Sequence, residues 1–334
     1  MRVLFTKGRL EPVSQNRILK AAPALRRGPR PTYFYSSIFY DLKPACEARG
    51  WEVETFFVGA SKPQQLKRPD IIVNLISEPL LCGRALNRLD EFIRENPTPV
   101  MNSVEATRRS SRLALGRILS NVETETGWKV HVPLTTRFTD VYGALPNHVA
   151  AQRHTWPVLV RPPGIHGGRG MRRIENPEAL GGDPAERVDL LVTDFVDYRD
   201  SDGHFQKYRM IWADGRLFRR HRIFSEEWNV GGEARVHMLD RPKLIEAEKE
   251  FLSSSNDELD DLVGQLFQAI GLNLGLIDFS VSDEKVLSVF ELNGSFQISS
   301  SIPEEKMDVW GYLEENNSEI MDAILAGIER RGGN

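Results

Sequence analysis

The stretch LGLIDFSVSDEKVLSVFELN, residues 274–293, decides the fold. Two apolar runs flank the polar turn at 282–285, and this pattern predicts two antiparallel strands. Three polar side chains interrupt the runs: Asp278 in the first, and Glu291 and Asn293 in the second. Glu291 and Asn293 are two residues apart, so they share one face of a regular strand, and Asp278 can reach that face across the turn.

These three side chains predict a metal site. Two carboxylates and an amide oxygen are costly in an apolar sheet unless something positive lies between them. Hard oxygen ligands of this kind suit Mg²⁺, with water and phosphate completing its coordination. The alternative is that they are polar strand-end residues open to solvent, and the spacing by itself does not choose between the two interpretations.

A candidate anion site precedes this hairpin in the chain. WPVLVRP (156–162) predicts an apolar strand, and PGIHGGRG (163–170) follows it as a glycine-rich loop. Such a loop lets backbone N–H groups point inward at an anion. Its spacing is not that of a Walker A loop, and many hairpins use glycine only for turning. The anion interpretation gains support from the arginines that crowd around the loop: Arg161, Arg169, Arg172 and Arg173.

Between the two motifs, KYRMIWADGRLFRRHRIF (207–224) predicts a hairpin that turns at its Asp-Gly pair. On alternating strand positions, Arg220 and Arg222 share one face of this hairpin. Arg219 and His221 share the other face. Such a row of cations could neutralise a polyanionic transition state, or it could be a solvated sheet edge whose charge discourages aggregation.

Strand and helix signals alternate in the first third of the chain, which predicts a parallel sheet covered on both faces. The predicted strands are 3–5, 51–58, 71–76 and 97–102, and the predicted helices are 41–49 and 104–119, capped by Asp41 and Ser103, and 83–95. No GxGxxG follows the first strand, so a dinucleotide site there is unsupported. Later segments predict a strand over 189–196 and helices over 258–271 and 317–331.

Composition predicts an ordinary globular protein. The chain has 334 residues, of which 40% are hydrophobic and 27% charged, enough for about two domains. No run approaches the ~18 apolar residues of a membrane span, and the first residues lack a secretory pattern. With Cys46 and Cys82 as the only cysteines, no disulfide framework is expected. We therefore expect a cytoplasmic protein without a membrane partner.

The basic residues are unevenly distributed. The chain holds 32 Arg and 11 Lys, with no lysine between Lys129 and Lys207, so an anion site in that stretch must use Arg, backbone N–H groups or a metal. Residues 1–40 hold eight basic groups against Glu11 alone. This segment could bind a nucleic acid or an acidic partner, or be a solvated insertion. Nucleic-acid binding is the poorer interpretation, because no aromatic-rich RNA motif accompanies the charge.

Taken together, these motifs resemble the ATP-grasp superfamily, and within it the glutathione synthetase-like ligases. The resemblance covers nearly the whole chain: PVMNSVEATRRSSRLALGRIL (99–119) is similar to the family's p-x-N…t-x-x-(K/R)…a-x-x-L passage, and VPLT (132–135) to its vP-x-T. It implies an α/β chain, α+β in its C-terminal parts, with the ATP-grasp fold. The implied parts are a Rossmann-like pre-ATP-grasp domain over 1–122, a central lid over 123–195 and a catalytic domain over 196–334.

Carried over to matching positions, the resemblance implies roles for individual residues. Asp278, Glu291 and Asn293 match the Mg²⁺ ligands, with two ions expected and Mn²⁺ able to substitute. The implied ATP-binding residues are Arg112 (with Arg109 as runner-up), Arg161 in place of the family's usual Lys, His166, Gly167, Gly168, Gly170, Thr193, Asp194, Phe195, Val196 and Lys207. Asp197 or Asp202 would hold the ribose. Arg209 and Arg222 match catalytic positions that contact the γ-phosphate or the acyl group.

The implied activity is ATP-dependent ligation of a carboxylate to an amine. The carboxylate would attack the γ-phosphate to give an acyl phosphate and ADP, and the amine would then displace phosphate. The acceptor site for a small-molecule or peptide acid and an amine would be lined by Gly294, Ser295, Phe296, Gln297, Ser299 and Ser300, with additions from Glu226, Trp228, Asn229 and the loop at 231–235. A homodimer is left open. Because the N-terminal part matches no housekeeping ligase, natural-product or peptide tailoring is favoured. The alternatives are a kinase that stops after phosphoryl transfer and an ATP-binding regulator without turnover.

Overall fold

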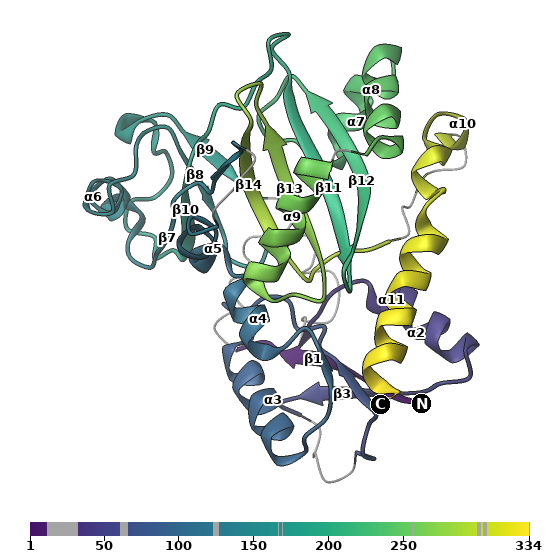
Figure 1. Ribbon diagram of the computed structural model, residues 1–334. Coiled ribbons are helices and arrows are strands. Elements are labelled where there is room, and N and C mark those ends of the chain that lie inside the picture. Colours follow the sequence, from purple (N-terminus) through teal and green to yellow (C-terminus); the bar gives the residue numbers. More distant parts are fainter. Residues whose placement is uncertain are drawn as a thin grey trace.

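The computed structural model describes residues 1–11, 33–60, 66–122, 127–165, 167–168, 170–255, 257–298, 302 and 306–333. Its framework is three sheets. Figure 1 shows the first at the bottom of the molecule, the second at the left and the third above the first. Most of the basic N-terminal segment, 12–32, lies outside the described residues.

The first sheet is built from the apolar runs of the N-terminal third. β1 pairs in parallel with β3 and β4, and antiparallel with the short β2, while β5 extends the sheet beside β4. Its elements are β1 (Arg2–Arg9), β2 (Tyr33–Phe34), β3 (Glu52–Val58), β4 (Ile71–Val73), β5 (Val100–Met101), α2 (Phe39–Ala48) and α3 (Gly83–Glu95). α3 buries Leu86, Leu89 and Phe92, as its helical spacing predicts.

Two helices differ from their sequence predictions. The helix predicted over 104–119 is two helices, α4 (Val104–Arg109) and α5 (Arg112–Leu119). Ser103 caps α4 as predicted, since its Oγ accepts the Ala106 N–H at 3.0 Å. The prediction that Asp41 caps its helix is wrong, because α2 begins at Phe39. The Asp41 carboxylate instead accepts the Ile298 N–H at 3.1 Å, a contact across the molecule.

The second sheet is antiparallel, in the order β7-β10-β8-β9. Its elements are β7 (Thr135–Phe138), β8 (Val158–Arg161), β9 (Arg172–Ile174), β10 (Leu190–Asp194) and α6 (Leu145–Ala151). Its small separate core includes Phe138, Leu145, Val158 and Val192. The strand predicted over 189–196 ends at Asp194, so the chain leaves the sheet at Phe195.

The third sheet has the order β12-β11-β13-β14-β6. Its strands are β6 (Lys129–His131), β11 (Phe205–Ala213), β12 (Arg216–Ser225), β13 (Leu274–Val281) and β14 (Val286–Asn293). β6 reaches it from a distant part of the sequence and pairs in parallel with β14. α9 (Asp257–Ile270) buries Leu262, Leu266 and Ile270 against this sheet. It ends at Gly271, whose φ of +88° suits a C′ glycine.

A β-bulge interrupts the third sheet between β13 and β14. Asp278 pairs with Glu291, but the next residue, Phe279, pairs with Val289. Phe290 is therefore the extra residue of the bulge. A bulge shifts the alternation of side chains by one position, so Phe290 and Glu291 both reach the same side of the sheet.

A second bulge, between β11 and β12, overturns the predicted faces of the arginine row. Arg209 pairs with His221 while Met210 pairs with Arg219, which leaves Arg220 as the extra residue. Strict alternation predicts that Arg220 and Arg222 share a face, and this prediction is wrong. Arg219 instead shares the face of Arg222, since Arg219 lies over Phe251 and Arg222 over Tyr208, two rings in contact with each other.

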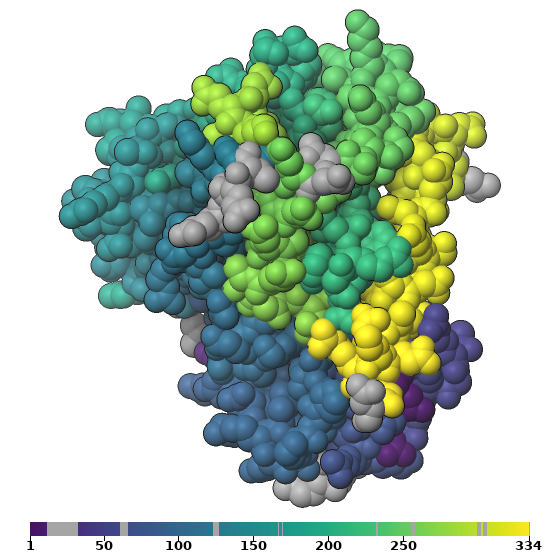
Figure 2. All heavy atoms as spheres, in the orientation of Figure 1, coloured from purple at the N-terminus to yellow at the C-terminus, as the bar shows by residue number. Residues whose placement is uncertain are grey.

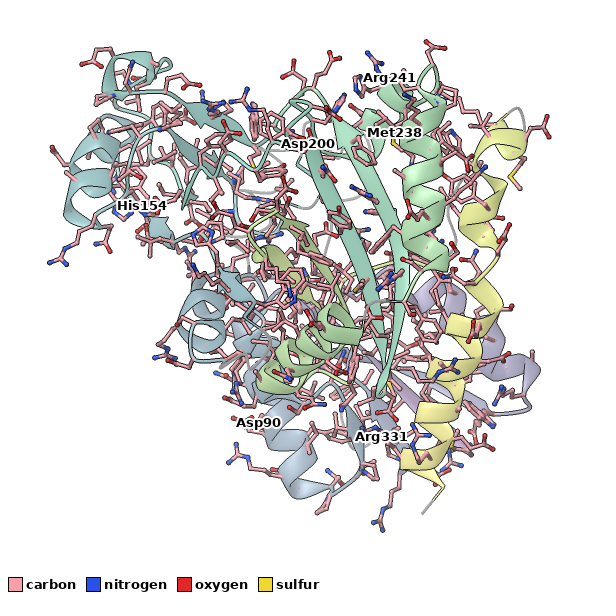
Figure 3. All side chains as sticks on the ribbon, turned by 45° about the horizontal axis from the view of Figure 1, so that its top comes forward. Asp90, His154, Asp200, Met238, Arg241 and Arg331 are labelled. Atoms are coloured by element: carbon pink, nitrogen blue, oxygen red, sulfur yellow. The ribbon has the colours of Figure 1, made fainter. Side chains whose placement is uncertain are left out.

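The remaining helices are α7 (Arg235–Met238), α8 (Pro242–Ser253), α10 (Met307–Trp310) and α11 (Asn317–Gly332). In Figure 2, α10 and α11 lie in the long yellow band that descends the right side, and α11 reaches the N-terminal part. Near its lower end, where Figure 3 labels Arg331, Arg330 and Arg331 bind Asp214 in the β11–β12 turn, at 2.6 and 2.9 Å. None of the helices in the described part of the chain has the length and apolar character to cross a membrane.

Asn102 joins the first sheet to the third. It follows β5, is 3% exposed and has a φ of +61°. Its Oδ1 accepts the N–H groups of Asn273 and Leu274, both at 2.9 Å, and its Nδ2 donates to the Leu274 carbonyl at 2.7 Å. One amide side chain therefore satisfies three main-chain groups where the chain enters β13.

We predict that Asn102→Ala lowers the free energy of unfolding by about 3 kcal/mol or more, because each buried group left unpaired costs about 1–3 kcal/mol and alanine disfavours positive φ. Asn102→Gly is the matched control, since glycine accepts the backbone conformation without making the hydrogen bonds. Urea unfolding followed by circular dichroism should show glycine recovering only the smaller, conformational part. If the alanine variant unfolds like the native chain, the junction contributes little.

Candidate active site

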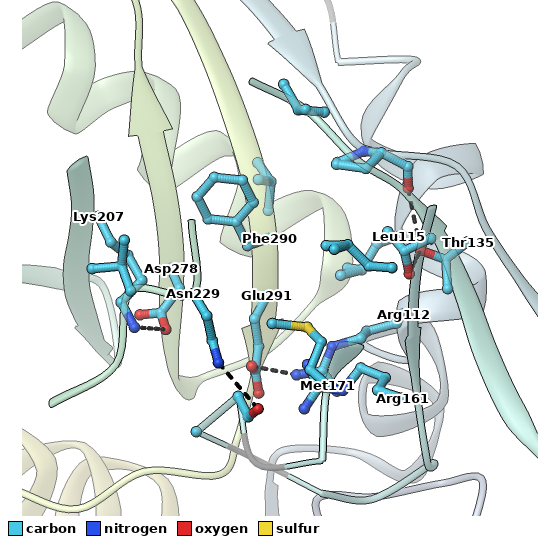
Figure 4. Close-up of a pocket in the computed structure, with 18 of the residues that line it drawn as sticks. Arg112, Leu115, Thr135, Arg161, Met171, Lys207, Asn229, Asp278, Phe290 and Glu291 are labelled. Carbon is cyan, nitrogen blue, oxygen red and sulfur yellow. Dashed lines mark hydrogen bonds and ion pairs between the residues drawn. The ribbon is translucent and has the colours of Figure 1, made fainter. Parts of the chain in front are cut away.

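A cavity of about 390 Å³ lies between the second and third sheets, within the usual size of small-molecule sites. One wall is formed by β8 and β10 of the second sheet, and the opposite wall by β13 and β14 of the third. α5 closes one end, and Ser37, at the start of α2, lies at another. Figure 4 shows this cavity with its polar side chains directed inward from several elements.

A row of charged side chains crosses one wall of the cavity. Arg209 on β11 lies opposite Asp278 on β13, which lies opposite Glu291 on β14. Directly opposed residues in antiparallel strands project from the same face, so the three charges are neighbours. Arg209 donates to both carboxylate oxygens of Asp278, at 2.6 and 2.8 Å. The sheet register thus brings together two predicted metal ligands and one predicted catalytic arginine.

Asp278 is charged although it is buried. Burial raises the pKa of its carboxyl group, but the charges of Arg209 and Lys207 outweigh burial and hold that pKa below its ordinary value. Lys207 Nζ lies 3.7 Å from the carboxylate. Burial in turn lowers the pKa of Lys207, only partly opposed by Asp278. The floor of the site is therefore a compact group of paired charges with little contact with solvent.

Glu291 is held from two sides. Arg112, the first residue of α5, forms an ion pair with it, and the Asn293 amide donates to its other oxygen. The side chains of Arg112 and Glu291 are only 11% and 15% exposed. Arg109, the alternative to Arg112, instead donates to the carbonyl of Ala269 at 2.7 Å and does not line the cavity. The structure therefore brings Arg112, and not Arg109, to the site.

Arg161 ends β8 and lines the cavity at 9% exposure. It donates to the Ile165 carbonyl, while its Nε has no hydrogen-bond partner. Burial, followed by the neighbouring charge of Arg112, lowers the pKa of Arg161 to about 9. No ion pair joins it to any carboxylate of the described residues. In Figure 4, Arg112 and Arg161 extend from the right toward Glu291, and this cationic end of the cavity would be stabilised by a bound anion.

The predicted ATP-binding residues 193–196, which we call the hinge, all line the cavity. Thr193 and Asp194 end β10, and Phe195 and Val196 follow it on the way to the third sheet. Thr193 Oγ1 lies 3.1 Å from Thr135 Oγ1 on β7. Asp194 Oδ1 lies 2.6 Å from Nδ1 of the buried His154, which Figure 3 labels in the second-sheet region. These contacts fix the hinge side chains to the second sheet.

The glycine-rich loop closes another side of the cavity. Gly167 and Gly168 line it with φ values of +70° and +71°. Asn229 Nδ2 donates to the Gly168 carbonyl at 3.4 Å, and a Cβ on Gly168 would lie 2.2 Å from Asn229 Oδ1. The positive φ therefore favours glycine at 168, and a larger residue would also have to displace the Asn229 side chain.

Several predicted residues do not line the cavity. Arg222 lies on the opposite side of the third sheet, where it donates to Gln206 Oε1 at 2.7 Å and covers the Tyr208 ring. Asp197 binds Arg199, at 2.5 Å, and Asp202 lies in the exposed turn that follows. Gly170 is in the loop but outside the cavity lining. His166 lies outside the described residues.

The cavity also contains residues that the sequence patterns did not indicate. The clearest are Ser37, Leu115, Met171 and Phe290. Phe290 reaches the cavity only because of the bulge beside Glu291. A pattern of regular alternation places it on the other face, so no local signal could have identified it. The expected acceptor residues Ser295, Phe296 and Gln297 do line the cavity, as do Trp228 and Asn229.

The carboxylates of Asp278 and Glu291 line the cavity and suit a hard divalent cation, whereas Asn293 lies outside the lining and its Oδ1 accepts the Ser295 N–H at 2.7 Å. Asp278 and Glu291 are adjacent carboxylates in a cavity wall, with the Asn293 amide beside Glu291. In this structure Arg209 and Arg112 neutralise them. The described residues contain no group of three or more His, Cys, Asp or Glu that could hold a metal ion. Water and a bound phosphate would therefore have to supply the remaining ligands, as is usual for Mg²⁺.

Comparison with solved structures shows the ATP-grasp fold. D-alanine–D-alanine ligase from Bacillus anthracis has a TM-score of 0.52 and 11% identity, over 100% of this chain and 99% of that one. An ATP-grasp RimK domain protein from Sphaerobacter thermophilus has a TM-score of 0.49 and 16% identity, over 97% and 100%. The macrocyclase MdnC from Microcystis aeruginosa, solved with its precursor peptide MdnA, has a TM-score of 0.49 and 11% identity, over 99% and 100%. No family model matches the chain, and no curated protein matches it significantly.

We predict that Arg161→Met leaves the thermal unfolding midpoint unchanged or higher, because it removes a buried charge that lies beside Arg112. The same change should weaken ADP binding at least about tenfold, close to 1.4 kcal/mol. Isothermal titration calorimetry checks the affinity, with Arg172→Met, an exposed arginine of the same sheet, as the control. Native affinity in the Arg161 variant would place phosphate binding elsewhere.

Proposed function

We propose that this chain is an ATP-dependent ligase that activates a carboxylate as an acyl phosphate and joins it to an amine, releasing ADP and phosphate. The observation that carries the proposal is the meeting of the Arg209–Asp278–Glu291 row with Arg112 and Arg161 in one cavity. Both steps of such a reaction collect negative charge at one place, which needs converging cations and metal-binding carboxylates.

Different residues of the cavity would bind the adenine and the phosphates of the nucleotide. The hinge at 193–196, together with the apolar side chains of Leu159 and Met171, forms a surface suited to adenine. Arg112 and Arg161 are suited to the phosphates, because a guanidinium makes planar paired contacts with a phosphate and stays charged. Gly167 and Gly168 can bring main-chain N–H groups close to the same phosphates.

Mg²⁺ fits beside Asp278, Glu291 and Asn293, where it would polarise the phosphoryl oxygens; the proposal includes two ions and substitution by Mn²⁺. Arg209 keeps Asp278 ionised and oriented through two hydrogen bonds. Arg209 and Lys207 also direct positive charge at the point where the phosphoryl group is transferred. The reaction passes through an acyl phosphate of the substrate, so the enzyme needs no nucleophile of its own.

The substrates would occupy the part of the cavity beyond the carboxylates, lined by Ser37, Ser295, Phe296 and Gln297 on one side and Trp228 on the other. This lining mixes hydroxyl, amide and aromatic groups, which suits a small-molecule or peptide acid and an amine. A role in natural-product or peptide tailoring is the finer part of the proposal.

We also propose a division into an N-terminal domain over 1–122, a lid over 123–195 and a catalytic domain over 196–334. Each range contains most of one sheet, which supports the division. β6 is the exception, since it lies in the lid range and pairs with β14 of the third sheet. The lid is therefore tied to the catalytic sheet at its first strand.

Turnover assays with pools of substrates test the proposal. The full chain is incubated with ATP, MgCl₂, and mixtures of carboxylic acids and amines, and products are identified by mass spectrometry. ADP release that needs both pools, with a condensed product, supports the ligase. A phosphorylated product without condensation would indicate a kinase, and nucleotide binding without turnover across the pools would indicate a regulator.

We predict that Glu291→Gln lowers ATP turnover at least about 100-fold, because it removes one charge from the metal-binding pair. The circular dichroism spectrum should stay native. Glu284→Gln is the matched control, since Glu284 is an exposed residue in the β13–β14 turn. Near-native turnover in the Glu291 variant would remove the basis of the metal assignment.

A further inference from the structure

Residues 295–298 follow β14 after Gly294, belong to no helix or strand, and form a wall beside the cavity. We call them the acceptor wall. Ser295, Phe296 and Gln297 line the cavity beyond the carboxylates. Phe296 and Ile298 are 5% and 3% exposed and pack into the core beside the first sheet, whereas Gln297 is exposed. The wall therefore has a buried side and a side that faces the substrate space.

The start of α2 holds the acceptor wall from the N-terminal part. Ser36 Oγ accepts the Phe296 N–H at 3.1 Å, and Ser37 Oγ donates to the Phe296 carbonyl at 3.0 Å. The Asp41 carboxylate accepts the Ile298 N–H at 3.1 Å. Since the wall has no strand partner, these side chains satisfy main-chain groups that a sheet would otherwise pair.

Arg220 holds the wall from the opposite direction. Its Nη2 donates to the Ile298 carbonyl at 2.5 Å. Its Nη1 donates to the Leu313 carbonyl and, at 3.2 Å, to Asn316 Oδ1 just before α11. Arg220 can make these contacts because it is the extra residue of the β12 bulge, which turns it away from the face that carries Arg219.

The chemistry of Arg220 is unusual for a residue with a purely structural role. It is 7% exposed, and none of the described carboxylates forms an ion pair with it. Burial lowers its pKa to about 10, helped by the charge of Arg235. The charges of Glu314 and Glu248 oppose this shift only in part. A buried charge without a direct ion pair is costly, and an apolar side chain would fill the space more cheaply. Unlike an apolar side chain, the arginine offers a rigid planar set of donors, which here binds the oxygens of Ile298, Leu313 and Asn316 at the same time.

We propose that Arg220 is a positioning residue that fixes the acceptor wall through the Ile298 carbonyl, without contacting the nucleotide. The statement that this wall faces the acceptor rests on the proposed ligase function. The position of the wall rests only on the contacts above. Substrate selection is then shared by two distant parts of the sequence, the start of α2 and the bulge of β12.

Arg220→Met tests the proposal, and Arg219→Met is its matched control. Arg219 is the adjacent residue, 8% exposed, and donates to the Phe251 carbonyl, Ser254 and Asp260 on the opposite face. Hydrogen–deuterium exchange measured by mass spectrometry should show peptides covering 295–298 exchanging at least about tenfold faster in the Arg220 variant only. Calorimetric affinity for ADP with Mg²⁺ should stay within about twofold of native in both variants.

Unchanged exchange at 295–298 in the Arg220 variant, or an equal increase in the Arg219 variant, would overturn the proposal. Parallel loss of ADP affinity would overturn it as well. If Arg220→Met does not fold, Arg220→Lys gives the same comparison, since lysine retains the charge but not the fork of donors, and it should show an intermediate increase in exchange.

Steady-state kinetics connects the wall to substrate. With any acid and amine pair that the native chain condenses, Arg220→Met should raise the KM of one of them about tenfold and leave the KM of ATP unchanged. A raised KM for ATP would contradict the positioning role. If the native chain condenses nothing, the ligase function fails, while the exchange experiment still decides whether Arg220 positions the wall.

Discussion

The ion pair between Arg209 and Asp278, in register with Glu291 on the next strand, is the contact around which the rest of the molecule is arranged. A buried carboxylate is stable only beside a cation, and an antiparallel sheet places cross-strand neighbours at a fixed short distance. The pair therefore determines which face of the third sheet is the site. The glycine loop, α5 and the acceptor wall all meet that face.

Two buried arginines of this chain have no direct ion pair among the described residues. Arg161 and Arg220 are both buried, and neither forms an ion pair with a described carboxylate. Natural proteins tolerate such costs at functional sites and recover the stability elsewhere. Here the apolar cores of the three sheets and the Asn102 junction supply that stability. We interpret the two arginines as having different roles: Arg161 binds the nucleotide, and Arg220 positions the acceptor wall.

Local patterns predicted the elements that carry a strong periodic signal. The β13–β14 hairpin, α3 and α9 follow from apolar spacing, and the cap of α4 follows from Ser103. The predictions were wrong where a residue serves a distant partner. Asp41 has the chemistry of a cap but binds Ile298. The division of 104–119 at Ser110 turns α5 so that Arg112 reaches Glu291.

The sequence by itself determined which chemical groups are available: two carboxylates and an amide at fixed spacing in one hairpin, glycines where the loop needs positive φ, and arginine instead of lysine between 130 and 206. Only the tertiary structure decided which of the remaining side chains join them. The physical reason is the pair of bulges in the third sheet. One adds a residue to the edge strand β12 and the other adds a residue to β14, and each reverses the alternation of its strand. Phe290 and Arg220 therefore face the side of the charged row, while Arg222 lies on the other side. A bulge depends on pairing between strands, which no single strand encodes.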